Sequence, residues 1–126
     1  MKRETMKCTS YLISKKLKEA GFEGKAEFYF AVKGNLEPVP YEVLHKTSFL
    51  DYDLNLLLPT YDLETILDAL PKSLQGYELC IYFGVSFEQT KFTYNWQKLE
   101  TKQAWGESLA DTAGRLWLLL KEKGLV

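Results

Sequence analysis

The chain has 126 residues, 46% of them hydrophobic and 26% charged, which suits one globular domain over residues 1–126 and excludes a disordered chain. Its 16 basic and 17 acidic side chains give a net charge of -1, which excludes charge-driven binding to duplex DNA or an anionic membrane. The longest leucine-rich runs, residues 56–58 and 116–120, are far shorter than the roughly 20 apolar residues of a membrane-spanning helix. Because the charged N-terminus also lacks the apolar core of a signal peptide, we expect a cytoplasmic protein that binds neither nucleic acid nor membrane.

The two cysteines, Cys8 and Cys80, lie far apart in the sequence and do not form a CxxC motif. A chain of this length can fold without a disulfide staple. We therefore expect both thiols to be free.

The first predicted helix begins at Ser10, whose hydroxyl can cap its N-terminus. Its apolar stripe consists of Ile13, Leu17 and Ala20, at the spacing that places side chains on one face of a helix. Gly21 is the expected left-handed stop.

A β-hairpin is predicted next. Residues 27–32 alternate between the two faces of a strand, and residues 33–35 have the composition of a turn. The return arm, residues 36–44, contains Pro38 and Pro40, which have no N–H to donate to a neighbouring strand. We therefore place this arm at the edge of a sheet.

The second predicted helix follows residues 47–58, whose polar and apolar residues alternate as in a short strand, although Asp has poor strand propensity. Pro59 and Thr60 open the helix, with Thr60 as its N-cap. Its buried stripe consists of Leu63, Ile66, Leu67 and Leu70. Pro71 ends it.

A second hairpin is predicted over residues 77–96. The odd-numbered residues from Tyr77 to Phe87 are apolar, and three more aromatic residues alternate after the polar turn at residues 88–91. Pairing Phe87 with Phe92 across this turn places all of these side chains on one face. Together these elements predict an α+β fold, in which three amphipathic helices cover an antiparallel sheet of about four strands in the order α-β-β-α-β-β-α.

The aromatic residues, eight Tyr, seven Phe and three Trp, could form a stacking platform for nucleic-acid bases. Such platforms combine exposed rings with a basic groove, whereas most rings here share the predicted core face. Packing is therefore the favoured interpretation. The aromatic residues expected to remain outside the core are Tyr29, Tyr41 and Tyr82.

No GxSxG, HExxH, GxGxxG or P-loop pattern occurs. His45 is the only histidine, so a His-rich metal site is excluded, and a histidine at a strand end is the simpler interpretation. Asp51, Asp53 and Asn55 resemble the start of a calcium loop, but Leu56 stands where that loop needs glycine. A solvated strand face explains their alternation, and we expect no metal or cofactor.

The last predicted helix lies within residues 107–126. Its buried stripe consists of Leu109, Ala113, Leu116, Trp117 and Leu120. Asp111 and Arg115 are expected to form a solvated ion pair on the far side. Ala110, Gly114 and Leu118 form a shoulder beside them, and because glycine costs about 1 kcal/mol relative to alanine in a helix, we expect a close approach to this backbone.

Two alternatives account for the shoulder formed by Ala110, Gly114 and Leu118. Another helix of the same chain could pack there, or the shoulder could be a surface for a protein partner, including a second copy. Leu118 motivates the second alternative, because burial against the sheet does not explain its position.

The segment SLADTAGRLWLLLKEKG, preceded by LPTYDLETILDALP, resembles paired segments of small uncharacterised proteins of phage, prophage and gut-bacterial type. These carry a "PT.D.LL..LP" helix, an aromatic hairpin and a final "SLADALA.LWL.LKE.G" helix. The resemblance covers residues 58–126, and Thr112 and Gly114 depart from the alanine-rich pattern. It implies an accessory protein and supplies no catalytic residues.

We therefore expect a non-catalytic protein-interaction or accessory module, with self-association or a protein partner at the shoulder. The alternative, from a different class, is a small-ligand binder or enzyme with a pocket at the sheet edge. The residues available for that pocket are His45, Asp51, Asp53, Cys80 and Tyr82.

Overall fold

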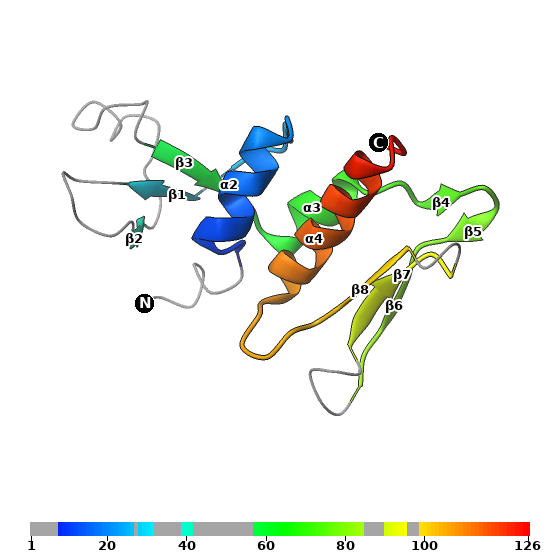
Figure 1. Ribbon diagram of the computed structural model, residues 1–126. Coiled ribbons are helices and arrows are strands. Elements are labelled where there is room, and N and C mark those ends of the chain that lie inside the picture. The colour runs from blue at the N-terminus through cyan, green and yellow to red at the C-terminus, as the bar shows by residue number, and fades with distance from the viewer. Residues whose placement is uncertain (1–7, 27, 32–38, 42–56, 85–89, 96–98) are drawn as a thin grey trace.

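The computed structural model describes residues 8–26, 28–31, 39–41, 57–84, 90–95 and 99–126 (Figure 1). The described residues form three helices and eight short strands in the order α-β-β-β-α-β-β-β-β-β-α, which confirms the mixed α+β class. The helices are α2 (Tyr11–Glu19), α3 (Leu63–Ala69) and α4 (Leu109–Glu122).

The strands form three small antiparallel sheets in the described residues, and not one sheet of about four strands. The first sheet has the order β2-β1-β3 and consists of β1 (Phe28–Ala31), β2 (Val39–Tyr41) and β3 (Leu57–Thr60). The second pairs β4 (Ser73–Leu74) with β5 (Tyr77–Glu78). The third has the order β6-β7-β8 and consists of β6 (Cys80–Tyr82), β7 (Lys91–Thr93) and β8 (Glu100–Lys102). Figure 1 shows the reason for the division, because the helices lie between the first and third sheets and keep the two hairpins apart.

The boundaries of α2 follow the prediction. The hydroxyl of Ser10 accepts a hydrogen bond from the N–H of Ile13, and Gly21 adopts a left-handed φ of +86° just after the helix. The N–H of Gly21 then bonds to the carbonyl of Lys18, and the N–H of Phe22 bonds to that of Leu17. This pair of bonds is a Schellman stop, and it turns Phe22 back towards the core.

The cap predicted for the second helix is wrong, because Thr60 belongs to β3 and pairs with Phe28 of β1. Asp62 caps α3 instead, and its Oδ1 accepts a 2.8 Å hydrogen bond from the N–H of Thr65. Pro59 is tolerated within β3 because β3 is an edge strand. The edge position predicted for the arm that contains Pro40 is confirmed, since β2 lies at the other edge of this sheet.

The second hairpin forms in a different register from the predicted one. Ile81 pairs with Phe92, a position that the prediction gave to Phe87. Asn95 explains the shorter strand, because its left-handed φ of +57° stops β7 and lets the chain return as β8. The slip is an even number of residues, so Phe92 and Tyr94 stay buried as predicted, whereas Phe83 is 70% exposed.

Helix α4 is the centre of the core and contacts α2, α3, β7 and β8. The predicted stripe is buried, except that Leu109 is half-buried. Asp111 also lies in the interior, where its Oδ1 accepts a hydrogen bond from the N–H of Ser10. The predicted solvated ion pair is therefore wrong, and Arg115 pairs with Glu107 at 2.7 Å. A helix covered by neighbours on several sides has no wide solvated face.

Candidate binding groove

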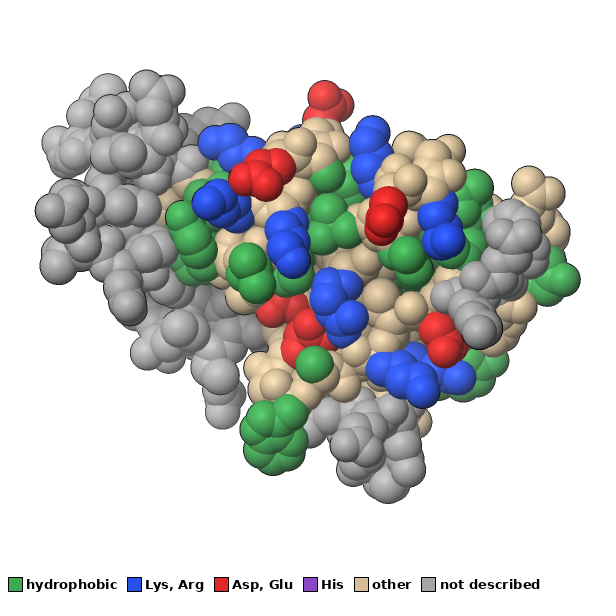
Figure 2. Space-filling view, in the orientation of Figure 1, with side chains coloured by type: hydrophobic (Ala, Val, Ile, Leu, Met, Phe, Trp, Pro, Cys, Tyr) green, Lys and Arg blue, Asp and Glu red, His purple; other side chains and the backbone are tan. Residues whose placement is uncertain are grey.

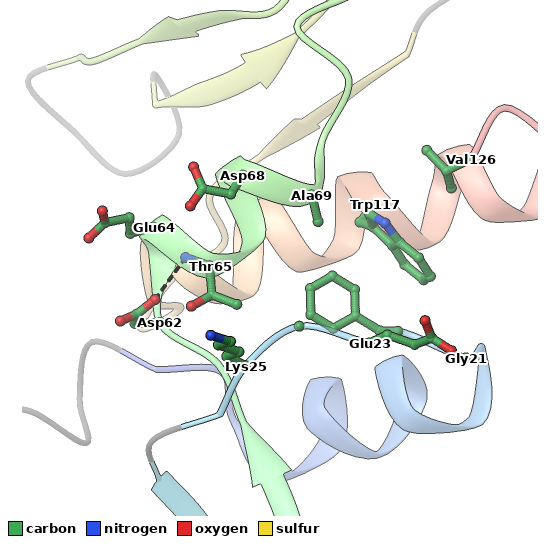
Figure 3. Close-up of a pocket in the computed structure, with 12 residues that line it drawn as sticks. Gly21, Glu23, Lys25, Asp62, Glu64, Thr65, Asp68, Ala69, Trp117 and Val126 are labelled. Atoms are coloured by element: carbon green, nitrogen blue, oxygen red, sulfur yellow. Dashed lines mark hydrogen bonds between the residues drawn. The ribbon is translucent and has the colours of Figure 1, made fainter.

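An open groove of about 750 Å³ lies between α3, the C-terminal end of α4 and the connection that follows α2 (Figure 3). Three segments far apart in the sequence meet here: residues 21–25, residues 62–69, and Trp117 with Val126. Figure 3 shows Trp117 and Val126 at one end of the groove, and Asp62, Thr65 and Lys25 at the other.

The floor of the groove is aromatic. The ring of Phe22 packs edge-on against Trp117 at a centroid distance of 5.0 Å, and against Tyr61 at 4.6 Å. All three residues are at most 7% exposed, so the rings are held in place by the core beneath them. Pairs of this geometry are worth about 0.5–1.5 kcal/mol beyond the area they bury. The floor is therefore rigid and apolar.

One wall depends on Gly24. A Cβ added to this residue would lie 2.5 Å from Cε1 of Phe22 and 2.7 Å from Cγ2 of Thr65. Both distances are shorter than non-bonded carbon atoms normally approach each other. Only glycine therefore lets the segment after α2 lie this close to both the aromatic ring and α3.

Four carboxylates and one ammonium group line the groove. The acidic residues are Glu23, Asp62, Glu64 and Asp68, and the basic one is Lys25. Asp62 and Glu64 also serve α3, since an N-cap and an acidic first turn stabilise the start of a helix. Glu23 and Asp68 are exposed and serve no such purpose. The groove thus combines an apolar floor with an acidic rim.

The described lining residues carry mostly carboxylate and apolar side chains. Among these described residues, Thr65 carries the only hydroxyl, and none is Cys, His or Ser. Within the described ranges, no group of three or more His, Cys, Asp or Glu side chains could hold a metal ion. The four carboxylates give the lining a negative charge that a cationic ligand could contact.

A buried polar cluster lies between the start of α2 and the end of β3. Thr9, Ser14 and Thr60 are at most 2% exposed and bond to one another, with Oγ1 of Thr9 lying 2.6 Å from Oγ of Ser14. The hydroxyl of Thr60 donates to the carbonyl of Thr9 at 2.7 Å. In the described part of the chain, no buried side-chain nitrogen or oxygen lacks a partner. Because its groups are satisfied internally, this cluster is structural.

Two carboxyl groups at the start of α4 have shifted pKa values. Burial raises the pKa of Asp111, and the hydrogen bonds from Ser10 only partly oppose this effect. Burial would also raise the pKa of Glu107, but hydrogen bonds from Arg115, Thr112 and the N–H of Ala104 together hold it below its ordinary value.

The structure places two of the three shoulder residues in the core. Ala110 and Gly114 are buried, and a Cβ added to Gly114 would lie 3.0 Å from Cγ2 of Ile13 and 3.6 Å from Leu17 and Ile66. The close approach expected at this glycine therefore comes from α2 and α3 of the same chain. Leu118 is half-buried and lines a separate hollow of about 680 Å³ between α2 and α4, beside Leu119.

The residues suggested for a ligand pocket are only partly described. Cys80 and Tyr82 lie on the same face of β6, where Tyr82 is 45% exposed and Nζ of Lys91 lies 5.3 Å from its ring centroid. His45, Asp51 and Asp53 lie outside the described residues. Neither Cys8 nor Cys80 forms a disulfide, as expected.

Sequence reasoning did not identify the groove, although it assigned Trp117 and Gly21 to the helices that border it. The signal that could have indicated it is the spacing of Gly21 and Gly24 around Phe22, directly after a helix. Two glycines so close together indicate a backbone that passes near other groups.

Comparison with known protein families, with curated protein sequences and with solved structures finds no match, so no residue role is taken from another protein. None of the helices in the described ranges has the length and apolar character needed to cross a membrane.

Proposed function

We propose that this protein is a non-catalytic interaction module whose groove binds a basic, amphipathic segment of a protein partner. The observation that carries the proposal is the combination of the Phe22–Trp117 floor with acidic residues along the rim. An apolar side chain of the partner would lie on the two rings, and flanking Lys or Arg side chains would face Glu23 and Asp68.

The charge of the groove lining supports a binding role of this kind. On the face shown in Figure 2, basic and acidic side chains are interspersed, whereas the groove lining carries four carboxylates and one ammonium group. The accessory role implied by the resemblance to phage-type proteins agrees with a module of this kind. Free thiols at Cys8 and Cys80 are typical of a reducing compartment, which supports a cytoplasmic location.

The test uses two designed helical peptides, one with leucine on one face and lysine on the other, and one in which glutamate replaces each lysine. We expect the lysine peptide to bind, as measured by calorimetry, and the glutamate peptide not to bind. Affinity should fall as salt is added, because rim charges are screened within about 10 Å at 0.1 M and about 3 Å at 1 M.

The matched variants are E23K/D68K in the groove and E78K/E122K outside it, which change the net charge equally. All four residues are exposed, and no side-chain bond of theirs is seen among the described residues. The first variant should weaken lysine-peptide binding by about tenfold, which corresponds to about 1.4 kcal/mol. Equal affinities for both variants would contradict the proposal.

A further inference from the structure

The turn between β8 and α4 presents a tryptophan to solvent. Trp105 is 89% exposed, more than any other large hydrophobic residue among those described. The turn beneath it is fixed, since the N–H of Glu107 bonds to the carbonyl of Ala104 at 3.0 Å and Gly106 supplies the left-handed position at φ +73°. A carboxylate oxygen of Glu107 also accepts a 3.1 Å bond from the N–H of Ala104.

A second exposed ring lies at the same end of the molecule. Phe83, which is 70% exposed, begins the connection between β6 and β7. Thr90 ties this connection to the Trp105 turn, because its hydroxyl accepts from the N–H of Gly84 and its carbonyl accepts from the N–H of Gln103 at 2.8 Å. Large aromatic side chains on a fixed backbone bury much apolar area on binding and lose little conformational freedom.

Trp105 lies far from the Phe22–Trp117 floor of the groove in its own chain. It precedes α4, whereas Trp117 and Val126 line the groove at the other end of that helix. The 14 residues of α4 extend over about 21 Å. Figure 1 shows the loop after β8 and the C-terminus at opposite ends of α4. Contact between Trp105 and this floor therefore requires two molecules.

The Trp105 turn and the groove carry charges of opposite sign. Around the Trp105 turn, Glu107 is neutralised by Arg115, and Lys102 is exposed on the preceding strand. Lys91 lies directly opposite Lys102 in the sheet and is paired with Glu100 at 3.7 Å, so the excess positive charge among the described residues of this end is that of Lys102. This end is therefore slightly basic, whereas the rim of the groove is acidic.

We propose that the segment bound by the groove is the Trp105 turn of a second copy of this chain. This inference rests on the proposed function of the groove. Trp105 of one copy lies against Phe22 and Trp117 of the next, and Lys102 faces the acidic rim. The two surfaces differ, so the contact is head-to-tail, and a row of copies ends in an unoccupied groove on one side and an exposed Trp105 turn on the other.

A complementation experiment tests this arrangement with two variants, W105A and E23K/D68K. Wild-type protein should show a weight-average mass that rises with concentration in sedimentation experiments, and each variant alone should stay monomeric. An equimolar mixture should form a one-to-one complex that does not grow further, because the intact groove of W105A accepts Trp105 of the other variant. The E78K/E122K protein should behave like the wild type.

Three outcomes would overturn the inference: a monomeric wild type at all concentrations, a W105A protein that associates like the wild type, or a mixture that stays monomeric. The lysine peptide separates this failure from failure of the groove itself. If wild-type protein stays monomeric but binds the peptide, the groove keeps its proposed function and only the identity of its partner is wrong. If it does neither, both proposals fail.

Discussion

The backbone N–H of Ser10 donates a 2.6 Å hydrogen bond to Oδ1 of Asp111, joining the start of α2 to the first turn of α4 across 101 positions of sequence. Ser10 caps α2, and Ser108, which caps α4, donates its hydroxyl to the carbonyl of Cys8 at 3.2 Å. Each helix start is thus bonded to the other. Asp111 is only 7% exposed, so this junction depends on a carboxylate removed from water.

Replacing Asp111 with Asn should make stability less dependent on pH. Burial raises the pKa of Asp111 in the folded state, so its contribution is fully present below the unfolded pKa and is lost as pH rises through the folded pKa. D111N keeps an acceptor for Ser10 but carries no charge. Its stability relative to the wild type should therefore increase over this window, by about 1.4 kcal/mol for each unit by which the pKa is raised.

Urea denaturation at several pH values measures this difference. D111A is the control for the hydrogen bond, because it removes the acceptor and leaves the N–H of Ser10 unsatisfied, at a cost of about 1–3 kcal/mol. A stability difference between D111N and wild type that is constant with pH would show that Asp111 does not titrate differently on folding.

Glu107 should behave in the opposite way. Despite its burial, hydrogen bonds from Arg115, Thr112 and Ala104 lower its pKa, so its stabilising contribution is present above the unfolded pKa and is lost as pH falls through the folded pKa. E107Q should destabilise the protein by about 1.5–3 kcal/mol at neutral pH, the range for hydrogen bonds to charged groups. The difference should disappear in acid.

The control for Glu107 is Glu100, whose carboxylate lies 3.7 Å from Lys91 with both side chains about one-third exposed. Exposed ion pairs contribute about 0–1 kcal/mol, so E100Q should have little effect in the same denaturation series. If the two substitutions cost the same at neutral pH, the network around Glu107 has no special strength.

The parts of the fold that sequence predicted are those set by local chemistry. Ser10 and Gly21 limit α2 through bonds within the helix and its first neighbours, and Pro40 excludes its strand from the sheet interior. Alternation likewise placed Phe92 and Tyr94 in the core, even though the register was wrong. The alternation of buried residues along a strand and the capping of a helix are unchanged by such a slip in register, because neither depends on the partner strand.

The parts that sequence missed depend on segments distant in the chain. Asp111 appears solvated on a helical wheel, because the wheel does not show that α2 begins beside it. The local sequence predicts Thr60 as a helix cap, because it does not show that Thr60 pairs with Phe28 in a sheet. The groove needs Phe22, Thr65 and Trp117 together, and no local pattern links these three positions.

Tyr94 should titrate only in strongly alkaline solution. Burial raises its pKa to about 12, and its hydroxyl donates a hydrogen bond to the carbonyl of Pro71. The stability that this tyrosine contributes should be intact below pH 10 and be lost as pH rises towards 12. Y94F should cost about 1–3 kcal/mol at neutral pH, because the carbonyl of Pro71 loses its donor.

Ultraviolet absorbance follows tyrosine ionisation directly, and comparison of wild type with Y94F isolates the contribution of Tyr94. Y82F is the matched control, since Tyr82 is 45% exposed on β6. Ionisation of Tyr94 in the same pH range as the exposed tyrosines, without unfolding, would contradict the burial that the structure assigns to it.

Gly114 should resist replacement although it lies inside a helix. Alanine would gain about 1 kcal/mol of helix propensity. However, its Cβ would lie 3.0 Å from Cγ2 of Ile13, a methyl group whose rotation is restricted because Ile13 is β-branched and itself within α2. Overpacking of this kind costs about 1–3 kcal/mol, so G114A should be destabilising by up to about 2 kcal/mol in urea denaturation.

The double variant G114A/I13A tests the cause, because removing the Ile13 methyl group makes room for the Cβ that alanine adds at position 114. Its cost should be smaller than the summed costs of G114A and I13A, by about 1 kcal/mol. Strict additivity would mean that α2 does not limit the size of residue 114, and that the glycine has another reason.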